Sequence, residues 1–178
     1  MQLWKRIAWF TTTAFASPVI LAQTPGISSA APTGDGAAAV QRALQEQLAE
    51  IQLSKIAQNN STSPVVINFA KATVRDETQK THALRELAEK KGIQVPESLD
   101  AEHAAMVKVL GSKSGSELDA YYTKDMARTD ESLIQIYQSQ SADNDRDIAG
   151  YAQSALPQEE QHDKLAESLA DSTARRAT

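Results

Sequence analysis

The chain has 178 residues, with 18 Lys and Arg against 23 Asp and Glu, 5% aromatic residues and no cysteine. This length fits one domain, and the low aromatic, glycine and proline content favours helices over a β-sandwich. The net charge of −5 argues against nucleic acid as a partner, and the lack of cysteine excludes disulfides, thiolate nucleophiles and Cys-ligated metals.

The N-terminus has the three-part layout of a secretory signal peptide. Lys5 and Arg6 precede a largely apolar stretch over residues 7–22, and a polar turn follows it. The 16 residues of this stretch are fewer than the roughly 20 that span a bilayer. Residues 1–22 are therefore expected to be a cleaved signal peptide rather than a membrane anchor. Cleavage after Ala22 removes two basic residues and takes the charge from −5 to −7. The sequence therefore predicts a periplasmic or secreted protein with no transmembrane segment in the mature chain.

Residues 23–36 are rich in proline, glycine and serine and have almost no large apolar side chain, so we expect a flexible leader there. A helical domain is expected over residues 37–173. Apolar residues recur at the 3.6-residue helical period over residues 37–60, 63–91, 100–111, 116–140 and 145–172. Four long amphipathic helices with mostly short links predict an all-α, antiparallel four-helix bundle, with the short helix as an extra element between the second and third long helices.

Each long helix also carries carboxylates on or beside its apolar stripe. In the last helix Glu159 and His162 are three positions apart and lie on one face. Carboxylates from facing helices, together with a Glu-x-x-His pair, are the ligand pattern of di-metal carboxylate bundles. The candidate metal ligands are Glu50, Glu77, Asp119, Asp130, Glu159 and His162. Glu46, one turn before Glu50, is a further carboxylate on the first helix.

The simpler interpretation is structural, and the spacing alone favours it. Glu77 would pair with Arg75 or Lys80 at the surface, and Asp130 with Arg128. The other two histidines, His82 and His103, are expected at ordinary surface or boundary positions. The sequence shows neither a glycine-rich phosphate loop nor a Gly-x-Ser-x-Gly turn, so it gives no sign of nucleophilic hydrolysis.

Several short motifs in a fixed order resemble domain of unknown function 4142, an exported bacterial family often labelled as outer membrane proteins. The motifs include Phe69-Ala70, Arg75-Asp76, Gly115 with Leu118-Asp119, Tyr151-Ala152, Leu156-Pro157 and His162. The resemblance covers residues 42–170 and implies a ferritin-like fold. The family pattern has an Asp-His pair in the second and the third long helix, where this chain has Asp76-Glu77 and Thr129-Asp130. The resemblance thus implies either oxygen ligands for a hard cation such as manganese, calcium or magnesium, or a site that has lost its metal.

Two functions of different classes are compatible with these features. The favoured one is an exported, non-enzymatic helical bundle that acts in envelope maintenance, stress tolerance or binding of an envelope protein. The alternative is a metal-binding, ferritin-like protein with a divalent cation and oxidative activity at the six candidate ligands. The two differ in what compensates the acids: a scaffold only needs each acid to be paired, whereas a metal-binding protein uses the acids to hold an ion.

Overall fold

The structure is a computed structural model that describes residues 34–177, with side chains through Arg175. The expected signal peptide and nearly all of the expected leader lie outside the described residues. The described part contains no strand and forms five helices: α1 Gly34–Asn60, α2 Pro64–Lys90, α3 Ala101–Gly111, α4 Gly115–Gln140 and α5 Arg146–Ala177. The prediction of an all-α fold is therefore confirmed. No described helix is both long and apolar enough to cross a membrane.

The helix ends follow local sequence signals. Pro64 opens α2, where a missing amide proton costs nothing, and Gly92 with φ of 66° follows its end. The α1 helix begins three residues before the predicted start, and Gly36 in its first turn lies against the Asp143 side chain. The α5 helix continues through Pro157 and extends five residues past its predicted end.

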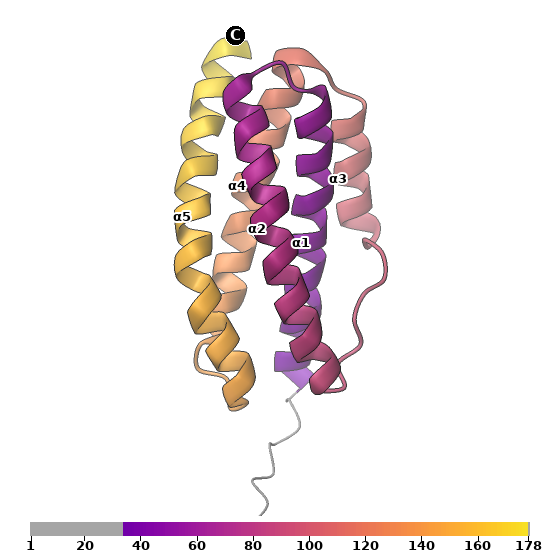
Figure 1. Ribbon diagram of the computed structural model, residues 1–178, viewed down its shortest axis with the longest axis vertical. Coiled ribbons are helices and arrows are strands. Elements are labelled where there is room, and N and C mark those ends of the chain that lie inside the picture. The colour runs from indigo at the N-terminus through magenta and orange to yellow at the C-terminus, as the bar shows by residue number, and fades with distance from the viewer. Residues whose placement is uncertain (1–33, 178) are drawn as a thin grey trace, which may run out of the picture.

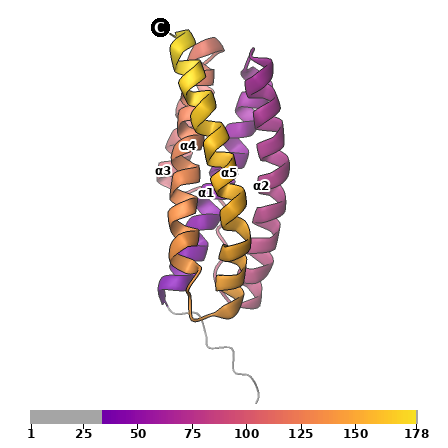
Figure 2. The same cartoon turned by 90° about the vertical axis from the view of Figure 1, so that its left-hand side faces the viewer.

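The four long helices lie side by side along the length of the molecule, and α3 packs on the outside (Figures 1 and 2). The α1 helix packs along α2 and α4, and α4 packs along α5, whereas the backbones of α2 and α5 approach each other closely at few points. The seam between α2 and α5 is therefore the loosest of the bundle.

The apolar core is divided into two clusters at opposite ends of the bundle. The first includes Val40, Leu44, Leu84, Leu133, Ile136 and Ile148. The second includes Leu53, Val66, Leu110, Leu118, Tyr122 and Met126. Burying each such side chain contributes roughly 1.5–3 kcal/mol to folding, so both clusters stabilise the helix contacts. Between them every long helix presents at least one buried polar side chain to the axis.

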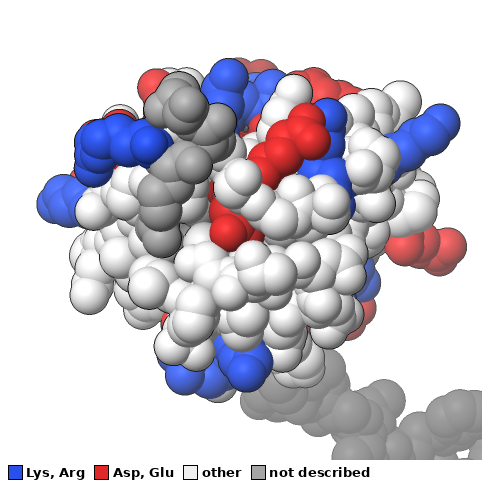
Figure 3. Space-filling view, turned by 90° about the horizontal axis from the view of Figure 1, so that it is seen from above, with Lys and Arg blue, Asp and Glu red and all other residues white. Residues whose placement is uncertain are grey.

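Charged side chains of both signs lie on the end of the bundle that Figure 3 shows. Figure 3 shows one end of the bundle, where Lys and Arg alternate with Asp and Glu around a largely uncharged surface. On this face the described residues present no basic patch, in keeping with the composition.

Candidate metal centre

A polar layer crosses the middle of the bundle between the two apolar clusters. Its members are Glu50 from α1, Glu77 and Lys80 from α2, Asp130 from α4, and Glu159 and His162 from α5. All four carboxylates of the layer are fully buried. Five of the six candidate ligands chosen from the sequence therefore lie at one level along the bundle axis.

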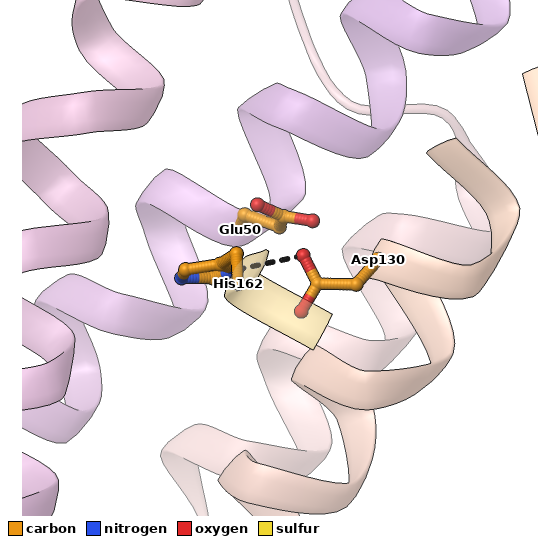
Figure 4. Close-up of side chains that lie close together, drawn as sticks. All are labelled: Glu50, Asp130 and His162. Carbon is orange, nitrogen blue, oxygen red and sulfur yellow. Dashed lines mark hydrogen bonds and ion pairs between the residues drawn. The ribbon is translucent and has the colours of Figure 1, made fainter. Parts of the chain in front are cut away.

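Three of these residues come together tightly. Glu50, Asp130 and His162 each offer one ligand atom, and these atoms lie within 4.8 Å of one another (Figure 4). Carboxylate oxygens and imidazole nitrogens bind metal ions at about 2.0–2.6 Å, so atoms on opposite sides of one ion lie about 4–5 Å apart. The three-residue cluster has the right size to hold a single cation.

Glu50 is the least compensated polar group of the layer. Neither of its carboxylate oxygens has a hydrogen-bond partner, and Asp130 Oδ2 also lacks one. Burial, together with repulsion from Asp130, Glu77 and Glu159, raises the pKa of Glu50 well above its usual value. A charged carboxylate in such a place is costly unless a proton or a cation compensates it.

His162 is oriented by contacts at both ring nitrogens. Nδ1 lies 2.7 Å from Asp130 Oδ1, and Nε2 lies 2.9 Å from Thr73 Oγ1. The Thr73 hydroxyl donates its only proton to the Phe69 carbonyl oxygen, 3.1 Å away, so it accepts a hydrogen bond from Nε2–H. Phe69 also stacks on the imidazole, with ring centroids 4.8 Å apart. Thr73 therefore fixes the tautomer that leaves Nδ1 to face the carboxylates, as in many metal-binding histidines.

The protonation of His162 depends on Asp130. Burial works against the charged imidazolium, but the hydrogen bond and the negative charge of Asp130 outweigh it, and the pKa of His162 is raised. When the imidazole is protonated, Nδ1–H donates to Asp130 Oδ1. A cation in the three-residue cluster would take the place of this proton.

The other two carboxylates of the layer share an ammonium group. Lys80 Nζ lies 2.6 Å from Glu159 Oε1 and also forms an ion pair with Glu77 Oε1, and only 11% of the Lys80 side chain is exposed. We call this arrangement the lysine bridge. Burial raises the pKa of Glu77 to about 8. Burial also disfavours the charged form of Lys80, but attraction to Glu159, Glu77 and Glu50 outweighs it and raises the pKa of Lys80.

The ion pairs suggested by the structural interpretation form differently. Glu77 does pair with Lys80, but inside the bundle rather than at the surface. Arg75 instead binds Asp76, and Arg128 contacts Glu102 rather than Asp130. The sequence signal for Lys80 was available, since this residue lies three positions after Glu77 and so on the same face of α2.

Asp119 is the one candidate ligand that the structure keeps apart. It is buried, but its carboxylate accepts a hydrogen bond from Ser61 Oγ in the connection between α1 and α2. Asp119 precedes Asp130 by eleven residues, which places it about 16 Å away along the axis of α4. Its spacing put it on the correct face but at the wrong level.

His103 was expected to be an ordinary surface or boundary residue, and the structure instead buries it. Its Nε2 lies 3.0 Å from Glu46 Oε2, and its Nδ1 lies 2.8 Å from Asp100 Oδ1. Asp100 also caps α3 by accepting a hydrogen bond from the His103 amide. The i, i+3 spacing of Asp100 and His103 was a signal for this arrangement. His82, by contrast, is exposed as expected.

A groove of about 520 Å³ opens from the polar layer to the surface along the loose seam between α2 and α5. Glu77, Lys80 and His162 reach into it from the layer. Its apolar walls include Phe69, Ala72, Leu165 and Leu169. The groove gives solvent a path to the lysine bridge and to one edge of the three-residue cluster.

Comparisons with known proteins agree with the fold. No curated protein matches the sequence. The crystal structure of a DUF305 fragment from Deinococcus radiodurans matches with a TM-score of 0.70, covering 79% of this chain and 97% of that chain at 14% identity, which shows a common helical fold. The family described as "Domain of unknown function (DUF4142)" matches residues 21–169, so the resemblance seen in the short motifs is confirmed. The chain belongs to the DUF4142 family.

Proposed function

We propose that the bundle binds one divalent cation between Glu50, Asp130 and His162. The observation that carries this proposal is Glu50, which is fully buried while both of its carboxylate oxygens lack a hydrogen-bond partner. Leaving a buried polar group unsatisfied costs about 1–3 kcal/mol, and more for a charged one. A cation among the three residues would compensate Glu50 and the free oxygen of Asp130 together.

The donor set favours a particular class of ion. Two carboxylates and one imidazole suit transition ions such as Mn²⁺ or Zn²⁺ better than Ca²⁺ or Mg²⁺, which prefer oxygen ligands alone. Three protein ligands leave coordination positions for water or another small molecule. The hydrogen bond from His162 Nε2 to Thr73 holds the imidazole in the orientation that such a site requires.

We also infer that the protein is exported and works in the cell envelope, as a ferritin-like, antiparallel four-helix bundle with α3 as its extra element. The charged start, the short apolar stretch and the polar turn of residues 1–26 support export. N-terminal sequencing of the mature protein should give a start between Ser17 and Pro32. An intact Met1 would contradict export.

The competing function is a non-enzymatic scaffold, which one feature of the structure favours. Lys80 already neutralises part of the buried charge without any ion, through its contacts with Glu77 and Glu159. A scaffold would need a proton on Glu50 and nothing more. The two functions therefore differ in the behaviour of the three-residue cluster alone.

Ion binding to the purified chain decides between them. Elemental analysis and calorimetric titration with Mn²⁺ and Zn²⁺ should give one ion per chain. Saturation at 100 times the dissociation constant should stabilise the fold by about 2.7 kcal/mol, seen as a higher melting temperature. Glu50→Gln and His162→Ala should abolish this increment, while Glu131→Gln, an exposed acid next to Asp130, should retain it. A melting temperature indifferent to both ions and to chelator would leave the scaffold function.

A further inference from the structure

We propose that Lys80 occupies a second cation position of the bundle, between Glu77 and Glu159, and that its ammonium group limits the protein to one bound divalent ion. This inference rests on the proposed function and extends it. It assigns to the lysine bridge the role of an internal cation, in the place where a second metal ion would otherwise bind.

The geometry of the lysine bridge resembles that of a metal position. Two carboxylates from facing helices, Glu77 of α2 and Glu159 of α5, converge on one positively charged group. Both carboxylates are fully buried, and Glu77 Oε2 and Glu159 Oε2 have no hydrogen-bond partner. The ammonium thus leaves half of the available ligand oxygens unused, and a divalent ion at this point could recruit them.

The lysine bridge lies next to the three-residue cluster. Glu159 and His162 are three residues apart on α5, and on α2 Glu77 follows Thr73, the partner of His162, by four. The two positions are therefore displaced by about one helical turn, or roughly 5 Å along the axis. At this separation, and between fully buried carboxylates, the charge at one position acts strongly on the other.

Formal charges explain why a single divalent ion suffices. When all four carboxylates of the polar layer are ionised, as they would be as metal ligands, they and Lys80 together carry −3. One divalent ion, with His162 neutral as its ligand, brings the layer to −1. Without the Lys80 charge the same layer would stand at −2, and a second divalent ion would neutralise it. Removing the ammonium should therefore create affinity for that ion.

The groove along the α2–α5 seam makes the second position accessible. Lys80 and Glu77 both line the groove, so a hydrated ion can reach the carboxylates from the surface once the side chain is shortened. Ala72 and Leu165 form part of the apolar wall beside this path and offer no competing ligand. Access does not require the helices to separate.

The test compares ion stoichiometry in the full-length wild-type chain, Lys80→Arg and Lys80→Ala, measured by elemental analysis and titration with Mn²⁺ and Zn²⁺. We expect one ion per chain in the wild type, one in Lys80→Arg, which keeps the charge, and two in Lys80→Ala. Adding Glu159→Gln to Lys80→Ala should remove the second ion and leave the first. The affinity for the second ion should fall at least tenfold when either Glu77 or Glu159 is replaced by glutamine.

Every outcome bears on the proposal. Two ions in the wild type, or one in folded Lys80→Ala, would overturn it. A Lys80→Ala chain that stays unfolded at saturating Mn²⁺ and Zn²⁺ would also overturn it, because an ion at this position should replace the lost ammonium. Absence of ions from the wild type would contradict the proposed function of the three-residue cluster, whereas an additional ion in Lys80→Ala would still support the second position.

Discussion

In two places in the bundle a histidine on an inward-facing surface contacts carboxylates, and the two groups differ in how completely their polar atoms are satisfied. In the first, His103 contacts both Glu46 and Asp100, and Ser132 Oγ donates to the other oxygen of Glu46 at 2.6 Å. In the second, the three-residue cluster, Glu50 makes no hydrogen bond at all. Burial alone therefore does not mark a binding site. The unsatisfied acceptors of Glu50 are what set the three-residue cluster apart.

The positions of the two groups account for this difference. Glu46 and His103 lie where α3 covers the outside of α1, and both keep a small exposed fraction, 9% and 7% of the residue. Their contacts attach α3 to the bundle. The three-residue cluster lies between the two apolar clusters, where no described side chain or backbone group supplies a partner for Glu50. The first group is built to join helices, and the second requires a proton or an ion.

Leu133→Asp should give the largest effect, because it places a carboxylate in the first apolar cluster without a partner of any kind. Leu133 is fully buried, and we expect a loss of more than about 4 kcal/mol in the free energy of unfolding. Urea denaturation would measure it. Lys90→Glu, at an exposed position near the end of α2, should change stability by less than about 1 kcal/mol. The reverse ranking would mean that the inward face of α4 is misassigned.

Glu46→Ala should come next, since it removes partners from both His103 and Ser132. We expect a loss of about 2–3 kcal/mol, the cost of leaving buried polar groups unsatisfied. Urea denaturation of Glu46→Ala, His103→Ala and the double variant would isolate the coupling between the two residues. A coupling near zero would show that the contact does not hold α3 in place. Glu86→Ala, at an exposed position of α2, provides the neutral control.

Glu50→Gln, unlike the two preceding variants, should not destabilise the fold when divalent ions are removed by chelator. The amide carries no charge and can donate to the free oxygen of Asp130, so stability should be unchanged or rise by about 1 kcal/mol. Thermal melts in chelator would show this. With Mn²⁺ or Zn²⁺ added, the order of wild type and variant should invert. A large loss in chelator would indicate that the Glu50 carboxylate has a partner and is structural.

The smallest effect should be a pH dependence at His103. The hydrogen bond to Glu46 raises its pKa above the usual value of 6.5, against the opposing effect of burial, and Asp100 contributes in the same direction. A raised pKa means that the folded chain holds the proton more tightly than the unfolded chain does. The resulting stabilisation is complete below pH 6.5 and disappears as the pH rises through the raised value. The free energy of unfolding of His103→Gln should therefore lie closer to that of the wild type at alkaline pH than at acidic pH. A deficit that grows with pH would contradict this assignment.

The sequence predicted the helices well because their signals are local. Apolar periodicity, Pro64 and Gly92 fixed the boundaries of α2 within a residue or two. The faces of the helices were also readable, so Glu50, Glu77, Asp130, Glu159 and His162 were selected together. These signals act within a few turns of one chain segment.

What the sequence could not give is the level of each side chain along the bundle. Asp119 fits the stripe of α4 as well as Asp130 does, and only the pairing of helices separates them. The burial of His103 depends on where the connection after α2 places α3. The lysine bridge likewise depends on a contact between α2 and α5, segments 79 residues apart at Lys80 and Glu159. Such contacts are set by tertiary packing and leave no local pattern.

The division of the core by a polar layer also fixes how the helices are aligned lengthwise. A core that was apolar along its whole length would allow one helix to slide past another. Here a slip of one turn, about 5.4 Å, would move Asp130 away from His162 and bring a leucine or methionine of a neighbouring turn against the buried acids. The α2, α4 and α5 helices therefore have one vertical register in which Asp130 meets His162 and Lys80 meets Glu159. Replacing the whole layer with leucine should raise the melting temperature while giving NMR spectra of several coexisting registers.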